Sequence, residues 1–350
     1  MKLNINEETK MKAVRYYAPG EPLRFEDAPI PRISSNDVLI EVRAAGICHT
    51  DLHFLQGVLK PWKGTLPLTL GHEIAGDISS VGDKVKSFKQ GDRVVITNVI
   101  PCGKCDYCKS GRENLCSDLD QIGFTADGGY AQFVKAPEKT LVKLPSNVSY
   151  EYGSVLTCAA ASCHHAIVNI AQAKKGETIL LNGFGGLGSN ALQIAKHIGL
   201  KVIAVDVAKE KLDLAEELGA EKTVNATSQN VPEEIKKFTA GKGVDIAIEF
   251  VGRTRTMENA FRSLGKSGRL VFVGYTKDMF TVSPLDLVVS ETSVKGSVAY
   301  TKKDLESVVK LAGEGKINPV ISEKVCLSEV NNTLERMQKG EIMGRAVAIP

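Results

Sequence analysis

Four cysteines lie close together in the first half of the chain, in the sequence Cys102-Gly-Lys-Cys105-Asp-Tyr-Cys108 followed by Cys116. Four thiolates within fifteen residues can surround one Zn²⁺ tetrahedrally and leave no open position, which is typical of a structural zinc site. A bacterial iron–sulfur run would have its fourth cysteine after three residues and a proline behind it, and neither occurs here. The spacing therefore predicts a structural zinc site, with unligated cysteines as the alternative.

A second group of candidate metal ligands is scattered along the chain. Cys48 in CHTD and His72 in GHE each follow an apolar run and a glycine. One cysteine and one histidine supply two of the three protein ligands of a catalytic zinc, whose fourth position takes water or substrate. Cys158, in VLTCAAASCHH, is a candidate third ligand at the junction of two differently patterned halves, which would place the metal in a cleft between domains. The spacing leaves other third ligands open, namely Cys163, His164, His165 and Glu73. Alternatively, the alanine-rich segment around Cys158 is plain helix core.

A glycine-rich loop follows the apolar segment ETILLNG and precedes the helical segment SNALQIAKHIG. The loop consists of Gly183, Phe184, Gly185, Gly186, Leu187 and Gly188. In this context Gly183 permits a tight turn, Gly185 lets the backbone approach a pyrophosphate, and Gly188 lets the helix pack on the strand, while the helix N-terminus offers N–H groups to phosphates. Asp206, eighteen residues further on, can accept hydrogen bonds from a ribose and repel a 2′-phosphate. The loop predicts NAD binding; a glycine turn without a nucleotide is the alternative.

Two patterns of elements must position these groups. Residues 12–145 hold short β-type runs separated by Gly, Pro and Asp, which predicts strands joined by turns. From about Tyr150, apolar strands alternate with helices, which indicates a parallel sheet covered by helices on both faces. This alternation fades near Val298, and the last fifty residues contain two helical stretches and a final strand. The first strand begins near Met11, so residues 1–10 are expected to form a solvated extension.

Composition narrows the classes of protein. The 350 residues favour two domains, and 43% hydrophobic and 24% charged residues are ordinary for a globular protein. With 44 Lys and Arg against 41 Asp and Glu and no basic block, neither nucleic acid nor an anionic membrane is an expected partner. The longest weakly apolar stretch, 153–171, contains polar side chains that disfavour a membrane span. The polar N-terminus lacks a secretory core, so we expect a cytoplasmic protein whose clustered cysteines hold metal, and eight cysteines are too few for a disulfide scaffold.

In combination, these motifs resemble the zinc-dependent alcohol dehydrogenases of the medium-chain dehydrogenase/reductase superfamily, over essentially residues 11–350. The motifs are CHTDLH at 48–53, LGHEIAG at 70–76, the four-cysteine segment, LTCA around Cys158, and GFGGLG with Asp206. The resemblance implies an α/β protein with a GroES-like β-rich catalytic domain, residues 1–160 and 299–350, and a Rossmann doubly wound coenzyme domain, residues 161–298. It also implies two zinc ions per chain, NAD, and a homodimer or homotetramer. It favours Cys158 over Cys163 as the third ligand.

The resemblance implies roles for individual residues. Cys48, His72 and Cys158 resemble the catalytic zinc ligands, Asp51 the carboxylate that orients the ligating imidazole, and Glu73 the acidic residue near the metal, while Thr50 and His53 match a proton relay. The implied cofactor contacts outside the glycine loop are Asp206, Lys211, Val273 and Arg345, with Lys211 on a ribose and Arg345 on the pyrophosphate. Alternatively, Asp51 is a turn residue, His53 a partly exposed surface histidine, and Lys211 and Arg345 solvated charges.

The reaction implied is the reversible oxidation of a primary or secondary alcohol, with zinc acting as a Lewis acid and the proton leaving through Thr50, a cofactor ribose hydroxyl and His53. Trp62, the only tryptophan, is expected to help shape the substrate mouth. The substrate is a small molecule whose identity the sequence does not give, and the roles of His164 and Cys163 stay open. The alternatives are a polyol, amino-alcohol or hydroxyacyl-thioester dehydrogenase, and a catalytically silent nucleotide- or zinc-binding protein.

Overall fold

The computed structural model describes residues 9–350, so most of the expected extension, residues 1–10, lies outside the described residues. The chain forms two compact units: the first contains the chain up to Cys158, Thr301–Glu314 and Ile321–Pro350, and the second contains Ala159–Tyr300 and Gly315–Val320. The sequence predicts a first domain of residues 1–160 and 299–350, whereas the second unit contains 159–160 and 299–300 at its boundaries and also 315–320. Residues 315–320 are held to the second unit by a pair of hydrogen bonds, in which the Gln193 side chain donates to Asn318 O (3.0 Å) and accepts from Asn318 N (2.7 Å).

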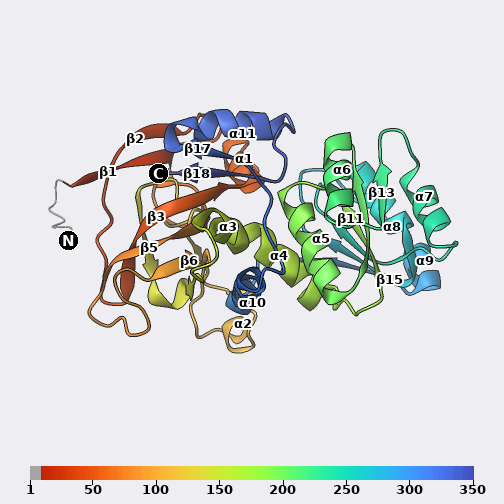
Figure 1. Ribbon diagram of the computed structural model, residues 1–350, viewed down its shortest axis with the longest axis horizontal. Coiled ribbons are helices and arrows are strands. Elements are labelled where there is room, and N and C mark those ends of the chain that lie inside the picture. Colours follow the sequence, from red (N-terminus) through yellow and green to blue (C-terminus); the bar gives the residue numbers. More distant parts are fainter. Residues whose placement is uncertain (1–8) are drawn as a thin grey trace. The chain divides into compact units, whose positions relative to one another are not determined.

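The first unit is built on a seven-stranded sheet in the order β10-β6-β5-β3-β18-β17, with β9 also paired to β3. These strands are β3 (Asp37–Ile47), β5 (Glu73–Val81), β6 (Arg93–Ile96), β9 (Phe133–Pro137), β10 (Leu141–Lys143), β17 (Ile321–Cys326) and β18 (Arg345–Ile349). The last strand, β18, lies antiparallel to β3, with Ala346 opposite Ile47, as can be followed in Figure 1. The last strand of the chain therefore joins strands from its first half in one sheet.

Smaller elements complete the first unit. Among the described residues, they are the sheet β2-β1-β4, the pair β7-β8, five α-helices and short 3-10 turns. Their bounds are β1 (Lys10–Tyr16), β2 (Arg24–Pro29), β4 (Leu68–Thr69), β7 (Val99–Ile100), β8 (Asp120–Gln121), α1 (His49–Leu55), α2 (Asp106–Lys109), α3 (Tyr150–Val155), α10 (Lys302–Gly313) and α11 (Val330–Gln338). The core joins sheet residues such as Ile40 and Ile74 to Phe54 of α1 and Leu334 of α11. Each such buried side chain contributes about 1.5–3 kcal/mol, so this core holds α1 firmly against the sheet.

The second unit contains a six-stranded parallel sheet in the order β13-β12-β11-β14-β15-β16, with α5 and α6 on one side and α7 and α8 on the other (Figure 1). Its strands are β11 (Thr178–Asn182), β12 (Lys201–Asp206), β13 (Lys222–Asn225), β14 (Val244–Glu249), β15 (Leu264–Phe272) and β16 (Ser293–Gly296). Its helices include α4 (Ala161–His164), α5 (Gly186–Ile198), α6 (Lys209–Glu217), α7 (Val231–Phe238), α8 (Thr254–Arg262) and α9 (Pro284–Ser290). The expected parallel sheet is confirmed, and this order is that of the doubly wound dinucleotide-binding fold.

Local sequence explains where α5 begins and ends. The helix starts in the glycine loop, buries Ala191, Leu192 and Ala195 against the sheet, and stops at Gly199. Gly199 adopts a left-handed conformation (φ 88°), which glycine adopts without the steric cost of a Cβ and which closes the helix. The N-terminus of α5 is thereby fixed at the carboxyl end of β11. Among residues 9–350, no helix combines the length and the apolar character needed to cross a bilayer.

Candidate metal centres and cofactor loop

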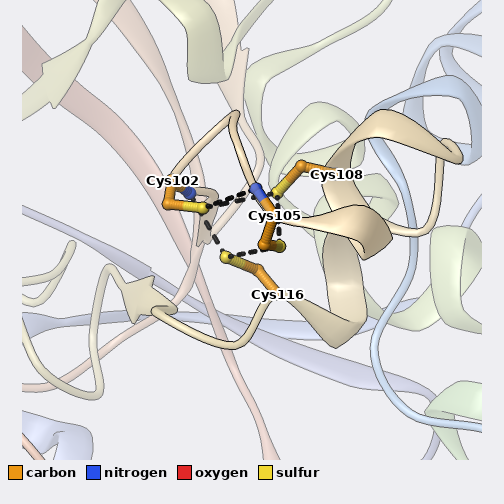
Figure 2. Close-up of side chains that lie close together, drawn as sticks. All are labelled: Cys102, Cys105, Cys108 and Cys116. Carbon is orange, nitrogen blue, oxygen red and sulfur yellow. Dashed lines mark hydrogen bonds between the residues drawn. The ribbon is translucent and has the colours of Figure 1, made fainter.

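The side chains of Cys102, Cys105, Cys108 and Cys116 point toward one another (Figure 2). The sulfur of Cys105 lies 3.5 Å from that of Cys108 and 3.9 Å from that of Cys116, and the sulfurs of Cys102 and Cys108 are 3.9 Å apart. Sulfur atoms placed tetrahedrally at about 2.3 Å from a zinc ion are about 3.8 Å from each other. The four thiols therefore fit one zinc ion without a further ligand. We call residues 102–116 the cysteine lobe.

Hydrogen bonds from backbone amides lower the pKa of two thiols in the cysteine lobe. Hydrogen bonds from the amides of Cys108 and Ser117 lower the pKa of Cys105 to about 5, and the amides of Lys104 and Cys105 lower the pKa of Cys102. Burial acts in the opposite direction on Cys108, whose pKa is raised to about 12. Two of the thiols are thus disposed to ionise, as metal ligands must be.

A second group of ligand atoms converges from distant parts of the chain. One atom each of Cys48, His72, Glu73 and Cys158 lies within 4.8 Å of the others. Adjacent strands bring three of them together, because β3 ends just before Cys48, β5 begins at Glu73, and Gly46 pairs with Glu73 in the sheet. Cys158 lies on a π-helical turn, Leu156–Ala160, that follows α3. We call these four residues the buried ligand cluster.

The buried ligand cluster is nearly closed to solvent, with Cys48 6% and His72 2% exposed. A hydrogen bond from the Cys158 thiol lowers the pKa of Cys48 well below its usual value, and the same bond raises the pKa of Cys158. Burial alone would lower the pKa of His72, but the Cys48 thiolate and Asp51 outweigh it and raise that pKa. The Cys48 thiolate therefore lies beside the His72 imidazole and the Cys158 thiol, and two sulfur ligands with one imidazole are a donor set that suits Zn²⁺.

Asp51 supports two members of this cluster. Its Oδ2 accepts a hydrogen bond from Cys48 N (3.1 Å), and its Oδ1 lies 3.7 Å from His72 Nδ1. With Nδ1 directed at Asp51, Nε2 is the His72 nitrogen left for a metal ion. Asp51 is fully buried in the first turn of α1, so it is not an exposed turn residue.

Glu73 and Arg345 form a buried ion pair, with Arg345 Nη2 2.8 Å from Glu73 Oε1. Burial raises the pKa of Glu73, and the Arg345 charge opposes this change. Arg345 is 5% exposed, so it is not a solvated charge. The acidic neighbour of His72 is therefore held by β18, the last strand of the chain.

Thr50 and His53 lie on α1, next to the buried ligand cluster. The Cys48 thiol lies 3.6 Å from the Thr50 hydroxyl oxygen. His53 is 7% exposed and stacks edge-to-face with His49 at 5.3 Å. Burial, with a further contribution from His49, lowers the pKa of His53, so the neutral ring persists below the usual pKa of histidine.

The alternative ligands named in the sequence analysis lie elsewhere. Cys163 is buried and its thiol donates to Leu187 O at 3.2 Å. His165 Nδ1 lies 3.3 Å from the Asn169 side-chain nitrogen. Within residues 9–350, neither these residues nor His164 belongs to a group of converging ligand atoms.

The glycine loop lies where β11 ends beside β14, the point at which the strand order of the second unit reverses. Gly183 has a φ of 99°, and a Cβ at Gly188 would overlap Gly183 O, so glycine permits both the turn and the close approach of α5. A Cβ at Gly185 would meet no atom within 4 Å, which leaves room for a ligand above the loop. Open sheets of this type bind ligands at such a reversal.

Of the other expected cofactor residues, Asp206, Lys211 and Val273 belong to the second unit, whereas Arg345 lies on β18 of the first. The Asp206 carboxylate ends β12 and accepts hydrogen bonds from Phe184 N (2.7 Å), Val207 N (2.8 Å) and Ala208 N (3.0 Å). A carboxylate offers about four lone-pair sites, so one remains for a ligand hydroxyl. Val273 follows β15 and donates its amide to Glu249 O at 2.9 Å, and Lys211 is half-buried on α6.

Two residues beside the buried ligand cluster, Phe124 and Tyr130, were not predicted from the sequence. Phe124 packs on the His72 ring with a centroid distance of 5.0 Å and also contacts the rings of Phe54 and Trp62. The Tyr130 hydroxyl donates to Asp51 Oδ2 at 2.6 Å, and burial raises its pKa, so it stays a donor. Only the glycine pair before Tyr130 hinted at a close approach of backbones; no spacing connects either residue to the ligands.

The chain matches two family models: an alcohol dehydrogenase GroES-like domain over residues 34–146 and a zinc-binding dehydrogenase over residues 186–314. It is 38% identical to an alcohol dehydrogenase of Geobacillus stearothermophilus and to an NAD-dependent alcohol dehydrogenase of Sulfolobus acidocaldarius, covering 96% of this chain and 99% of each relative. The crystal structure of an alcohol dehydrogenase from Aeropyrum pernix superimposes with a TM-score of 0.91 at 36% identity, covering 97% of this chain and all of that one.

Proposed function

The chain belongs to the zinc-dependent alcohol dehydrogenases of the medium-chain dehydrogenase/reductase superfamily, and we propose that the buried ligand cluster and α1 are its catalytic machinery. It is an oxidoreductase with a GroES-like domain and a Rossmann domain, and it oxidises alcohols with NAD⁺. One observation carries the assignment of the site: Cys48, His72 and Cys158, separated by up to 110 positions, present converging ligand atoms beside Thr50 and His53. A catalytically silent protein would have no need of this arrangement.

We propose two zinc ions per chain. The cysteine lobe offers four thiols and would hold a structural ion, whereas Cys48, His72 and Cys158 offer three ligands and leave a position for substrate. Glu73, held by Arg345, lies within reach of the second ion. When bound, that zinc supplies a Lewis acid that lowers the pKa of the substrate hydroxyl, and NAD⁺ supplies the hydride acceptor.

The proton released from the alcohol is proposed to leave along α1. Thr50, next to Cys48, is the nearest hydroxyl to the cluster on this helix, and His53 lies almost one turn further on. The lowered pKa of His53 keeps its ring neutral near pH 7, so it can accept a proton and pass it to water.

The glycine loop is proposed to bind NAD through residues Gly183–Gly188, with Val273, Lys211 and Arg345 as further contacts. The remaining lone pair of Asp206 accepts a ribose hydroxyl, and the negative charge of this carboxylate opposes a 2′-phosphate. NAD⁺ is therefore the preferred cofactor.

The substrate is proposed to be a primary or secondary alcohol with an apolar substituent. Phe124 covers one side of His72, and Trp62 packs on Phe124 while its indole nitrogen donates to Leu119 O at 3.2 Å. Aromatic faces gain from contact with hydrocarbon and offer few hydrogen bonds to extra hydroxyl groups. A polyol substrate is correspondingly disfavoured.

We propose that the chain forms homodimers, alone or within a homotetramer, through α9 and β16. The α9 side chains Leu285, Val288 and Val289 are more than 60% exposed, and β16 is the terminal strand of its sheet, paired on one side with β15. Exposed apolar patches and free strand edges mark association surfaces. The thiol ligands require reduced cysteines, which favours a cytoplasmic location.

The proposal is tested by following NADH formation with ethanol, butanol, cyclohexanol and a sugar alcohol, using protein of known zinc content. We expect turnover of the first three and little of the sugar alcohol. Cys326→Ser is the control for cysteine changes, because Cys326 is exposed and belongs to neither ligand group. Zinc-loaded protein that oxidises none of the apolar alcohols would contradict the proposed site.

A further inference from the structure

One buried tyrosine beside the buried ligand cluster has no part in the proposed reaction. Tyr130 is fully buried, and its hydroxyl donates to Asp51 Oδ2 at 2.6 Å across 79 positions of sequence. A second, longer contact joins this hydroxyl to Gly46 O at 3.4 Å. A hydrogen bond to a carboxylate is stronger than one between neutral groups, so the Asp51 contact dominates.

This hydrogen bond fixes which way the Asp51 carboxylate faces. Oδ2 is held by two donors, the Tyr130 hydroxyl and Cys48 N, while Oδ1 is turned toward His72 Nδ1. Without the hydroxyl, a single amide would hold the carboxylate, which could then rotate about its χ2 bond. Rotation would move Oδ1 away from His72, and the imidazole would lose the group that directs Nε2 at the metal.

The ring and backbone of Tyr130 also fix the segment that carries His72. Tyr130 N donates to Leu70 O (3.1 Å), and Gly129 N donates to Gly71 O (2.7 Å). Gly71 has a φ of 87°, and a Cβ there would lie 2.6 Å from the Tyr130 ring. The ring therefore lies directly against the residue that precedes His72, and glycine is required at that place.

We propose that Tyr130 is a positioning residue for the catalytic metal, acting through Asp51 on the orientation of His72. The proposal rests on the proposed function of Cys48, His72 and Cys158 as metal ligands. Groups that orient ligating histidines in this way typically contribute about 10–100-fold to metal affinity. Tyr130 acts one step further from the metal, because it orients the Asp51 carboxylate, which in turn orients His72.

Tyr130→Phe tests the proposal, because it removes the hydroxyl and keeps the ring against Gly71. Tyr16→Phe is the matched control: Tyr16 is also fully buried in the first unit, but its hydroxyl contacts Phe54 O at 3.4 Å and does not touch Asp51. Zinc affinity is measured by competition with a chromophoric chelator. Cys48→Ser lacks a ligand of the buried cluster, so the zinc-binding step that is lost in this variant is assigned to that cluster.

We expect Tyr130→Phe to weaken zinc binding at the buried cluster about tenfold or more and to leave the ion of the cysteine lobe unchanged. At saturating zinc, KM for NAD⁺ should stay the same. Tyr16→Phe should lower the melting temperature without changing either affinity. In an Asp51→Asn background, which lacks the carboxylate, the effect of Tyr130→Phe should shrink to less than about twofold, since linked residues are not additive.

The outcomes separate two failures. If wild-type protein binds zinc at the cysteine lobe alone, the proposed catalytic metal site is wrong. If two ions bind but Tyr130→Phe changes only the melting temperature, as Tyr16→Phe does, Tyr130 is a core residue and the inference is overturned. Equal losses of affinity in the wild-type and Asp51→Asn backgrounds would also overturn it, because Tyr130 would then act independently of Asp51.

Discussion

The cysteine lobe and the buried ligand cluster belong to the same unit of the protein but are built in opposite ways. The lobe takes four ligands from fifteen consecutive residues, and its helix α2, only four residues long, buries no side chain. The buried cluster takes its ligands from the residues at the end of β3 and the start of β5 and from the turn after α3, and β3 and β5 are packed in the main core. Little besides the metal would hold the lobe together, whereas the fold itself assembles the buried cluster.

This difference separates stability from chemistry. A metal ion that completes a weakly packed lobe contributes its binding free energy to folding. A metal ion placed in a preformed, nearly dry cluster contributes little to folding and is free to bind substrate at its open position. Loss of each ion should therefore have a different consequence, and the first two of the four predictions below test that separation.

The largest effect is expected from Cys48→Ser. The variant should stay folded and bind NAD⁺, since β3 and α1 are held by the core, but turnover should fall by at least about 10³-fold, because a Lewis acid is worth several kcal/mol to the reaction. Metal content by mass spectrometry should drop from two zinc ions per chain to one. Cys326→Ser, at an exposed cysteine, should keep both ions and near-normal turnover. Near-normal turnover of Cys48→Ser would show that the buried ligand cluster does not hold the catalytic metal.

Cys105→Ser should act mainly on stability. It leaves three thiols in a lobe without its own core, so the melting temperature should fall clearly, by an amount equivalent to a few kcal/mol. Cys105→Ser should affect the catalytic step only indirectly, so kcat should stay within about tenfold of wild type at a temperature where the protein stays folded. Cys326→Ser, at an exposed cysteine outside both groups, is the matched control and should change neither quantity. A variant that loses turnover without losing stability would assign catalysis to the lobe.

The same contrast explains what sequence could and could not predict. The lobe follows from the spacing of Cys102, Cys105, Cys108 and Cys116, because ligands so close in sequence need little help from the fold. Spacing alone could not choose between Cys158 and Cys163: Cys158 lies on a π-helical turn, and its sulfur meets Cys48 only through the tertiary fold.

Contacts between buried side chains were even harder to predict from the sequence. The contacts of Tyr130 with Asp51 and of Arg345 with Glu73 join residues 79 and 272 positions apart, and they depend on strand register, which motifs do not encode. The parallel sheet, in contrast, was predictable from its alternating apolar strands and helices.

A change in the second unit sharpens the comparison by leaving both metal groups intact. Asp206→Gly should raise KM for NAD⁺ about tenfold or more, because it removes a charged acceptor for the ribose and releases the amide of Phe184 in the glycine loop. The ratio of kcat/KM for NAD⁺ to that for NADP⁺ should fall toward one. Asp213→Ala, at an exposed carboxylate on α6, is the control, and zinc content should stay at two ions in both variants. A wild-type preference for NADP⁺ would refute the role given to Asp206.

The smallest effect should come from His53→Gln, which tests whether α1 carries protons away from the buried cluster without taking part in metal binding. Burial lowers the pKa of His53, so in wild type the neutral ring is available to accept a proton down to a pH below its usual pKa of about 6.5. Glutamine cannot titrate, and the variant must release the proton directly to water or hydroxide. Alcohol oxidation should therefore slow about tenfold near neutral pH, below the usual 10²–10⁴-fold range because solvent substitutes in part, and the loss should shrink as pH rises. His197→Gln, on the exposed side of α5, should have no effect. The measurement is kcat against pH at saturating alcohol and NAD⁺ with zinc content monitored; parallel profiles for wild type and His53→Gln at all pH values would show that His53 does not relay protons.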